Sequence, residues 1–150
     1  MPTALITGIT GQDGAYLAQL LLGKGYTVVG LMRRSASSDV IGERLRWLGI
    51  LSDVKLVDGN LTDLSSLIRI VQTSRPDEVY NLAAQSFVAA SWQQPLLTGG
   101  VTGLGAANML EAVRTARPIA TSRSTTPRPT TTPTHPTTES PTSSPASERV

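Results

Sequence analysis

The sequence predicts an α/β fold in which helices cover both faces of a parallel sheet, a doubly wound arrangement that is incomplete, with about four strands. Short apolar runs alternate with segments of helical periodicity along most of the chain. With 150 residues, the chain is long enough for one modest domain. After residue 118 the composition changes to Thr, Ser and Pro. We therefore expect a folded domain over residues 1–118 and a disordered tail over residues 119–150.

The first three predicted elements form one strand–helix–strand unit. Residues 4–7 are an apolar run bounded by Gly8, which is typical of a buried parallel strand. A helix is expected from Asp13 to the Gly23-Lys24-Gly25 segment, where a cation and glycines signal its end. Residues 26–32 form the second apolar run. The unit has the length of a right-handed crossover of about 30 residues.

The alternation continues to residue 113. We expect a short helix over residues 43–48, a strand over 54–57, a helix that Asp63 begins, and a strand over 78–82. The last helix is expected to bury an apolar stripe in steps of three and four residues, formed by Leu97, Val101, Leu104, Ala107, Leu110 and Val113. Trp47 and Trp92 are expected to pack in or near the core. A sheet of four strands would leave one edge exposed and prone to aggregation.

Composition excludes several classes of function. The formal net charge is only +2 and its signs are mixed, so nucleic-acid binding is not expected. The absence of cysteine excludes disulfides and thiolate metal sites, and we assign no metal site. The sequence contains neither a signal peptide nor a run of ~18 apolar residues. A cytoplasmic protein that does not bind membranes is therefore expected.

The turn after the first strand carries glycines at positions 8, 11 and 14, a G-x-x-G-x-x-G spacing. Gly8 permits a tight turn, Gly11 lets a pyrophosphate approach the backbone, and Gly14 lets the helix pack near the strand. The free N–H groups and the helix dipole then face the anion. Because the glycines lie between a predicted strand and a predicted helix, a Rossmann-type dinucleotide site is favoured over a turn without a ligand.

The end of the second strand indicates which dinucleotide binds. A site that prefers NAD usually places Asp or Glu there, but this chain has Arg33, Arg34 and Ser35, and the next acid is Asp39. Two guanidinium groups and a hydroxyl suit the 2′-phosphate of NADP. The sequence thus favours NADP as the cofactor; the alternative is a solvated loop.

Four segments carry a resemblance to a known family: residues 8–14, 33–35, 58–63 and 80–86. Over residues 3–118 the sequence resembles the N-terminal part of the GDP-mannose 4,6-dehydratase family, which are extended short-chain dehydrogenases/reductases. The resemblance implies conversion of GDP-mannose to GDP-4-keto-6-deoxymannose and water, through an internal hydride transfer by NADP. It also implies a homo-oligomer for full-length relatives and leaves the state of this chain open.

The resemblance further implies a set of site residues. Those assigned to the cofactor are Gly8, Ile9, Thr10, Gly11, Gln12, Asp13, Gly14, Arg33, Arg34, Ser35, Asn60, Leu61, Leu82, Ala83 and Ala84. Gln85 and Ser86 are assigned to the substrate. Two residues depart from the family pattern: Asn60 replaces the usual Asp, and Leu97 replaces a Tyr found in many members.

Three polar residues near the site keep two interpretations. Asp63 either caps a helix or binds a ligand. Asn81 and Gln85 either bind a ligand or form hydrogen bonds within a loop.

The family's chemistry also requires a Tyr-x-x-x-Lys pair. Here Tyr occurs at positions 16, 26 and 80 and Lys at 24 and 55, so no such pair exists and no catalytic residue is assigned. We therefore expect a truncated, inactive copy whose tail arises from an out-of-frame translation, or alternatively is a genuine Thr/Pro-rich linker. Two other hypotheses are a related sugar-nucleotide reductase or epimerase and a non-catalytic NADP-binding module. The Arg33-Arg34 pair and the Gln85-Ser86 segment favour the dehydratase over the reductase or epimerase.

Overall fold

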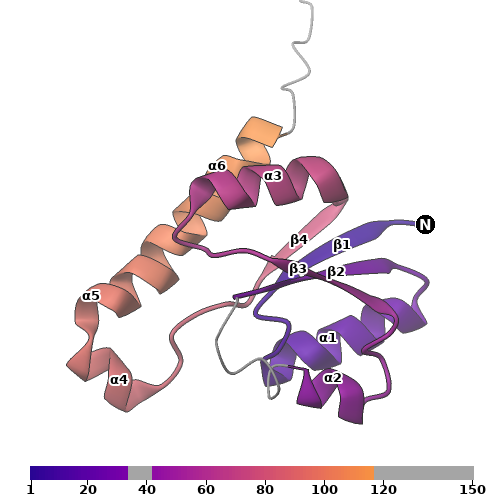
Figure 1. Cartoon of the computed structure of the whole chain (residues 1–150), viewed down its shortest axis with the longest axis horizontal. Coiled ribbons are helices and arrows are strands. Elements are labelled where there is room, and N and C mark those ends of the chain that lie inside the picture. Colours follow the sequence, from indigo (N-terminus) through magenta and orange to yellow (C-terminus); the bar gives the residue numbers. More distant parts are fainter. Residues whose placement is uncertain (34–41, 117–150) are drawn as a thin grey trace, which may run out of the picture. The chain divides into compact units, whose positions relative to one another are not determined.

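A computed structural model describes residues 1–33 and 42–116 (Figure 1). The strands are β1 (Thr3–Thr7), β2 (Thr27–Met32), β3 (Val54–Asp58) and β4 (Glu78–Asn81). The helices are α1 (Gln12–Gly23), α2 (Glu43–Trp47), α3 (Leu64–Ser74), α4 (Val88–Gln93), α5 (Pro95–Thr98) and α6 (Gly105–Ala116), with a π-helical segment, η2 (Gly99–Leu104), before α6. Arg34, Ser35 and the predicted tail lie outside the described residues.

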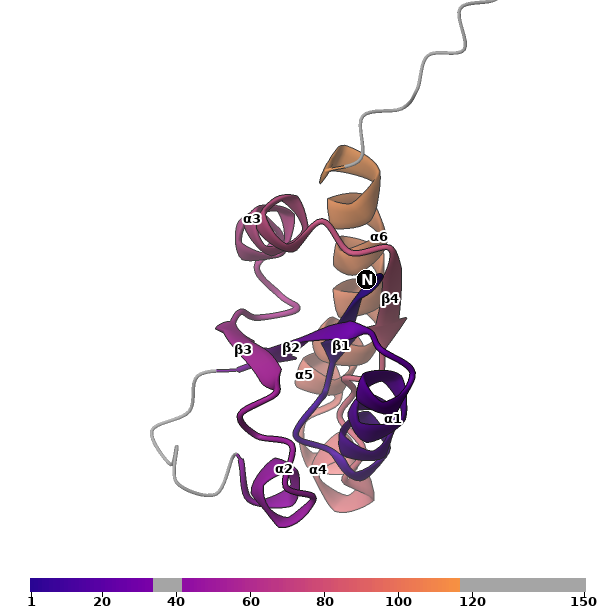
Figure 2. The same cartoon turned by 90° about the vertical axis from the view of Figure 1, so that its right-hand side faces the viewer.

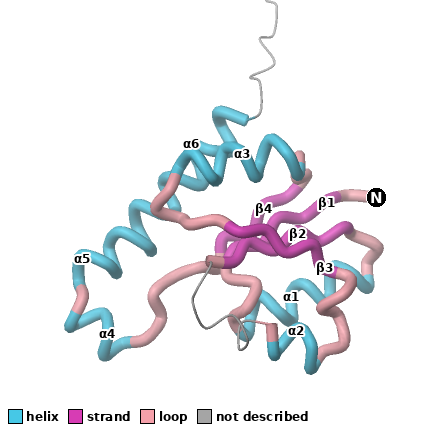
Figure 3. Tube along the Cα trace, in the orientation of Figure 1, coloured by secondary structure: helices cyan, strands magenta, loops and turns pink. Residues whose placement is uncertain are grey.

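The four strands form one parallel sheet in the order β3-β2-β1-β4 (Figure 3). Ala4 on β1 pairs with Val28 on β2 and with Glu78 on β4. All the carboxyl ends therefore meet at one edge of the sheet. Within the described residues β4 has a partner strand on one side only. The predicted α/β fold with a four-stranded parallel sheet is confirmed.

Alternate residues of the strands bury their side chains on opposite faces of the sheet, as strand geometry requires. Ala4 and Ile6 pack with residues of α1 and α2, whereas Leu5 packs with residues of α3 and α6. Figures 1 and 2 show these two helix pairs on opposite sides of the sheet. The result is two apolar cores, one on each face.

Helix α3 begins where the sequence predicts. The carboxylate of Asp63 accepts a hydrogen bond from the backbone N–H of Ser65 at 3.1 Å, so the capping interpretation of Asp63 is confirmed. The helix ends at Arg75, which has a left-handed backbone with φ of 44°.

The predicted stripe on the last helix is only partly correct: Val101 and Val113 pack against the core on the α3 side, but Leu104 and Leu110 do not. Leu104 and Leu110 are 59% and 73% exposed, and the buried residues of α6 are Gly105, Met109 and Ala112. A helix turns about 100° per residue, so each step of three falls about 60° short of a full turn. Three such steps, from residue 101 to residue 110, lead to the opposite face. The π-helical turn over 99–104 shifts the register further.

The expectation that both tryptophans pack in the core is also wrong. Trp47 is 78% exposed and Trp92 is 83% exposed. On α2 the buried position belongs to Leu45, and Trp47 lies two residues further on. Trp92 belongs to α4, none of whose residues is buried in the described structure. Helices α4 and α5 lie away from the sheet (Figure 3).

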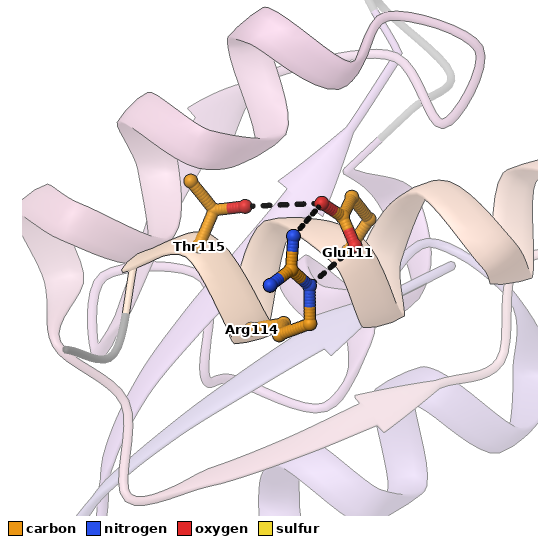
Figure 4. Close-up of polar contacts among 3 residues, drawn as sticks. All are labelled: Glu111, Arg114 and Thr115. Atoms are coloured by element: carbon orange, nitrogen blue, oxygen red, sulfur yellow. Dashed lines mark hydrogen bonds and ion pairs between the residues drawn. The ribbon is translucent and has the colours of Figure 1, made fainter. Parts of the chain in front are cut away.

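Two polar clusters lie outside the carboxyl edge. On α6, Glu111 and Arg114 form an exposed ion pair, and the Thr115 hydroxyl donates to the same carboxylate at 3.3 Å (Figure 4). The hydrogen bond from Arg114 lowers the pKa of Glu111, but exposed pairs contribute little to stability. Near the amino ends of the strands, the hydroxyls of Tyr26 and Tyr80 both donate to the carboxylate of Glu78.

No described helix combines the length and apolar character needed to cross a membrane.

Candidate functional site

A cleft of about 530 Å³ opens at the carboxyl edge of the sheet. Residues at the ends of all four strands line it: Gly8 after β1, Met32 on β2, Gly59 after β3 and Leu82 after β4. In open α/β sheets, ligands bind outside the carboxyl ends of the strands. The volume is within the range of small-molecule sites, about 300–1,000 Å³. This cleft is the candidate site.

The glycine turn is packed so closely that two of its glycines admit no side chain. Gly8 has a positive φ of 69°, and a Cβ there would lie 2.8 Å from the backbone nitrogen of Ala83. A Cβ at Gly14 would contact the Gly8 carbonyl and lie 2.7 Å from the Cα of Ile9. These contacts place the first turn of α1 directly against the end of β1, as the spacing predicts.

Gly11 differs because its surroundings are open. Among the described residues, only the carbonyl oxygen of Gly8 lies within 4 Å of a Cβ built on Gly11, at 3.1 Å. Gly11 is the N-cap of α1, and no side chain caps this helix end. Its backbone N–H donates to the Gly8 carbonyl at 2.9 Å, which closes the turn. The backbone N–H groups of the first turn of α1 thus face a lined cleft without a capping side chain, as an anion site requires.

The end of β1 is joined to the loop that follows β4. The Thr7 hydroxyl donates to the amide oxygen of Asn81 at 2.6 Å and accepts from the backbone N–H of Ala83 at 3.1 Å. Thr7 is fully buried. Asn81 therefore forms a structural hydrogen bond, but between the ends of two strands and not within a loop as one of its two interpretations had it. Thr7 was not assigned to the site from the sequence, although a polar residue at the end of an apolar strand can indicate such a hydrogen bond.

Hydrogen bonds also hold two of the residues assigned to the cofactor, Asn60 and Leu61. The side-chain oxygen of Asn60 accepts from the backbone N–H of Thr62 at 3.1 Å, and so stabilises a local turn. The carbonyl of Leu61 accepts from the side chain of Asn108 on α6 at 2.8 Å. Gly105 permits this approach of α6, since a Cβ there would lie 2.9 Å from the Cβ of Leu61.

The cleft brings together all but three of the predicted site residues. Those that line it are Gly8, Thr10, Gly11, Gln12, Asp13, Gly14, Arg33, Asn60, Leu61, Leu82, Ala83, Ala84, Gln85 and Ser86. Arg34 and Ser35 are outside the described residues. Ile9 does not line the cleft: its side chain is fully buried and packs against Gly30, where a Cβ would lie 2.5 Å from the Cδ1 of Ile9. Because the whole residue is buried and does not line the cleft, Ile9 is not placed to contact a ligand.

Five further residues line the cleft without having been assigned to it: Leu31, Met32, Gly59, Leu97 and Val101. The first three could have been found from their positions at strand ends. The last two come close because the backbone N–H of Gln85 donates to the Thr102 hydroxyl at 3.3 Å, which joins the loop after β4 to η2. Gln85 thus takes part in a loop hydrogen bond through its backbone. Sequence spacing does not reveal that contact.

The cleft has few charges. Among the described lining residues Arg33 is the only cation and Asp13 the only anion. No group of three or more potential metal ligands was found in the part of the chain that the structure describes. The lining combines small residues, apolar side chains and backbone amides, which suits a ligand with phosphate and ring portions.

The sheet order, the glycine turn and the cleft define a Rossmann-type domain of the short-chain dehydrogenase/reductase kind. The UDP-glucose 4-epimerase of Thermus thermophilus, solved in complex with NAD, superposes with a TM-score of 0.64 at 29% identity, over 76% of this chain and 34% of that chain. Residues 5–126 match the family model of GDP-mannose 4,6 dehydratase. The chain belongs to this family.

Curated relatives support the same family at higher identity. The GDP-mannose 4,6-dehydratase of Yersinia enterocolitica is 50% identical over 121 residues, which are 76% of this chain and 32% of the relative. GDP-mannose 4,6 dehydratase 2 of Arabidopsis thaliana is 51% identical over 117 residues, which are 74% of this chain and 31% of the relative. The chain thus spans about a third of the length of these relatives. The resemblance to the dehydratase family is confirmed.

Proposed function

We propose that the cleft binds NADP(H) as the cofactor-binding part of a GDP-mannose 4,6-dehydratase. The observation that carries this proposal is the open N-terminus of α1 at Gly11, which faces a cleft formed by the ends of four parallel strands. The pyrophosphate lies against residues 8–14, and the adenosine and nicotinamide ends extend toward residues 60–61 and 82–84. When bound, the nicotinamide supplies the redox chemistry, and the protein holds it in place.

The preference for NADP over NAD is supported by Arg33. It follows β2 directly and is the only cation among the described lining residues. A guanidinium group binds a phosphate through paired hydrogen bonds, whereas an acid at this strand end would repel the 2′-phosphate. Arg34 and Ser35, which lie outside the described residues, are proposed from the sequence alone to bind the same phosphate.

A fluorescence titration of the purified chain with NADPH and with NADH tests this proposal. We expect NADPH to bind at least about tenfold more tightly, a difference of about 1.4 kcal/mol. Arg33→Gln removes the charge but keeps a polar side chain, and it should abolish most of this preference while affecting NADH little. Equal affinity for the two dinucleotides would refute the preference for NADP. The absence of binding to either would refute the cofactor site.

The substrate proposed for the whole protein is GDP-mannose. Gln85 and Ser86 line the cleft and follow, in the sequence, the segment proposed for the nicotinamide end, which supports their proposed contact with the sugar. The identities of 50–51% to named dehydratases, against 29% to the superposed epimerase, favour this substrate over a UDP-sugar.

The 150-residue polypeptide itself is expected to bind the cofactor without turning over GDP-mannose. Its three tyrosines and two lysines include no Tyr-x-x-x-Lys pair to move the proton that accompanies hydride transfer. Incubation with GDP-mannose and NADP⁺, followed by chromatography of the sugar nucleotides, tests this expectation. Any formation of a 4-keto-6-deoxy sugar nucleotide by the purified chain would overturn it.

A further inference from the structure

One arginine outside the cleft contacts the glycine turn. Arg44 on α2 donates a hydrogen bond from Nη1 to the backbone carbonyl of Thr10 at 2.9 Å. The same peptide unit has its N–H on Gly11, which donates to the Gly8 carbonyl at 2.9 Å. The peptide unit between Thr10 and Gly11 is therefore held at both of its polar groups.

Holding both groups fixes the orientation of this peptide unit. A peptide is planar and trans, so its N–H and its C=O point in opposite directions and rotate together. Without the guanidinium, no hydrogen bond from a described residue would hold the Thr10 carbonyl, and only the bond from the Gly11 N–H would resist rotation of the unit. A rotation that turned the carbonyl oxygen toward the cleft would oppose a bound anion, because the oxygen carries partial negative charge.

The position of Arg44 is set by the helix that carries it. Leu45, the next residue, is fully buried in the core on the α1 side of the sheet and anchors α2 there. Arg44 lines a separate small hollow of about 140 Å³ with Gln12, Tyr16, Trp47 and Leu48. Of these residues only Gln12 also lines the main cleft. Arg44 thus contacts the backbone of the turn without itself lining the cleft.

We infer that Arg44 is a positioning residue for the dinucleotide pyrophosphate: it fixes the Thr10–Gly11 peptide so that the turn presents amide groups to the anion. This inference rests on the proposed function. Because Arg44 acts on the turn that both NADP and NAD would share, its loss weakens binding of the two dinucleotides equally. Arg33, in contrast, discriminates between them. This difference separates the two arginines experimentally.

The test compares Arg44→Gln, Arg44→Lys and the matched control Arg46→Gln. Arg46 lies on the same helix and is also exposed, so its substitution removes the same charge from the same element. We expect Arg44→Gln to weaken NADPH and NADH binding by a common factor of about ten, and Arg46→Gln by less than about twofold. Arg44→Lys restores a charged donor and should recover part of the loss. If the wild-type chain binds NADPH and Arg44→Gln binds it equally well, the inference is wrong and the proposed function stands.

A second measurement does not depend on binding. Hydrogen exchange of the Gly11 amide, measured by NMR without cofactor, should be faster in Arg44→Gln by about fivefold or more, an amount typical of one lost hydrogen bond. Amides of β1 should exchange at wild-type rates, which distinguishes a local change from general destabilisation. Unchanged exchange at Gly11 would overturn the inference. If the wild-type chain binds neither dinucleotide, the proposed function fails and the role of Arg44 in binding falls with it.

Discussion

The hydroxyl of Thr7 donates a hydrogen bond to the side-chain oxygen of Asn81 at 2.6 Å, between two strands whose residues are 74 positions apart in the sequence. Thr7 is fully buried, and its hydroxyl oxygen also accepts a hydrogen bond from the backbone N–H of Ala83. One side chain thereby fixes the loop after β4 against the glycine turn. The geometry of the cleft depends on this contact.

Thr7→Val should therefore destabilise the domain although it preserves size and shape. It removes both hydrogen bonds and leaves the partly buried N–H of Ala83 without its acceptor, at a cost of about 1–3 kcal/mol. Urea denaturation followed by circular dichroism measures the change. Thr7→Ser keeps the hydroxyl and should retain most of the stability. A Val variant as stable as the wild type would contradict the role assigned to this hydroxyl.

Two glycines of α1 should respond oppositely to alanine. At Gly14 a Cβ would overlap the backbone of Gly8 and Ile9, so Gly14→Ala should cost about 1–3 kcal/mol. At Gly23, the last residue of α1, no described atom lies within 4 Å of a Cβ, so Gly23→Ala should leave stability unchanged or raise it by up to about 1 kcal/mol. Thermal denaturation of both variants tests the pair. Similar midpoints for the two variants would contradict the tight packing around Gly14 and the open surroundings of Gly23.

Gly11→Ala should separate binding from folding. Its Cβ would approach only the Gly8 carbonyl, at 3.1 Å, and would otherwise occupy open space at the cleft. We expect a folded protein whose thermal midpoint is close to that of the wild type and whose NADPH affinity is at least about tenfold lower. Wild-type affinity in a folded Gly11→Ala protein would show that the pyrophosphate does not lie at this glycine.

The stability of the domain should fall at alkaline pH through Tyr26 and Tyr80. Their hydrogen bonds to Glu78 and its negative charge raise the pKa of both phenols above the ordinary value of about 10. The folded protein therefore retains these protons to a higher pH than the unfolded chain. The stabilisation is fully present below pH ~10 and is lost as the pH rises through the raised pKa values. Urea midpoints measured from pH 8 to about 12 should show this loss.

Glu78→Gln is the control for the pH experiment. It removes the charge that raises both pKa values, so its stability should depend less steeply on pH than that of the wild type. A slope identical to that of the wild type would mean that Glu78 does not influence the two phenols.

The register of α6 can be tested with two neighbouring residues. Met109 is buried in the core on the α3 side, whereas Leu110 is 73% exposed. Met109→Ala should lower the free energy of unfolding by about 2–5 kcal/mol, and Leu110→Ala by less than about 0.5 kcal/mol. A larger loss of stability in Leu110→Ala than in Met109→Ala would instead support the stripe that the sequence predicts.

The strands and the glycine turn could be predicted because their signals are local. Each strand is a short apolar run bounded by turn residues, and the glycine spacing lies within seven positions. Asp63 could be predicted as a cap because it contacts a residue only two positions away. The inward face of α6 was predicted only in part, because successive steps of three residues drift around the helix and the π-helical turn before α6 adds to this shift.

Contacts between distant residues were also beyond prediction. The bond from Thr7 to Asn81, the bond from Arg44 to Thr10 and the bond from Asn108 to Leu61 each join separate elements. The exposure of Trp47 and Trp92 depends on which neighbours surround them in space, which a single sequence does not specify. The sequence could therefore indicate most of the residues that line the cleft, but not the contacts that hold them in place.

The close approach of Gly8 to Ala83 has a consequence for how the domain forms during synthesis. The complete glycine motif is present within the first 14 residues, but one wall of the cleft arrives only with residues 82–86. A nascent chain that has not yet been extended to β4 contains the glycine motif but lacks the complete cleft. The proposed binding thus requires the step that adds β4 and the loop after it, so a bound dinucleotide would report that the four described strands have assembled.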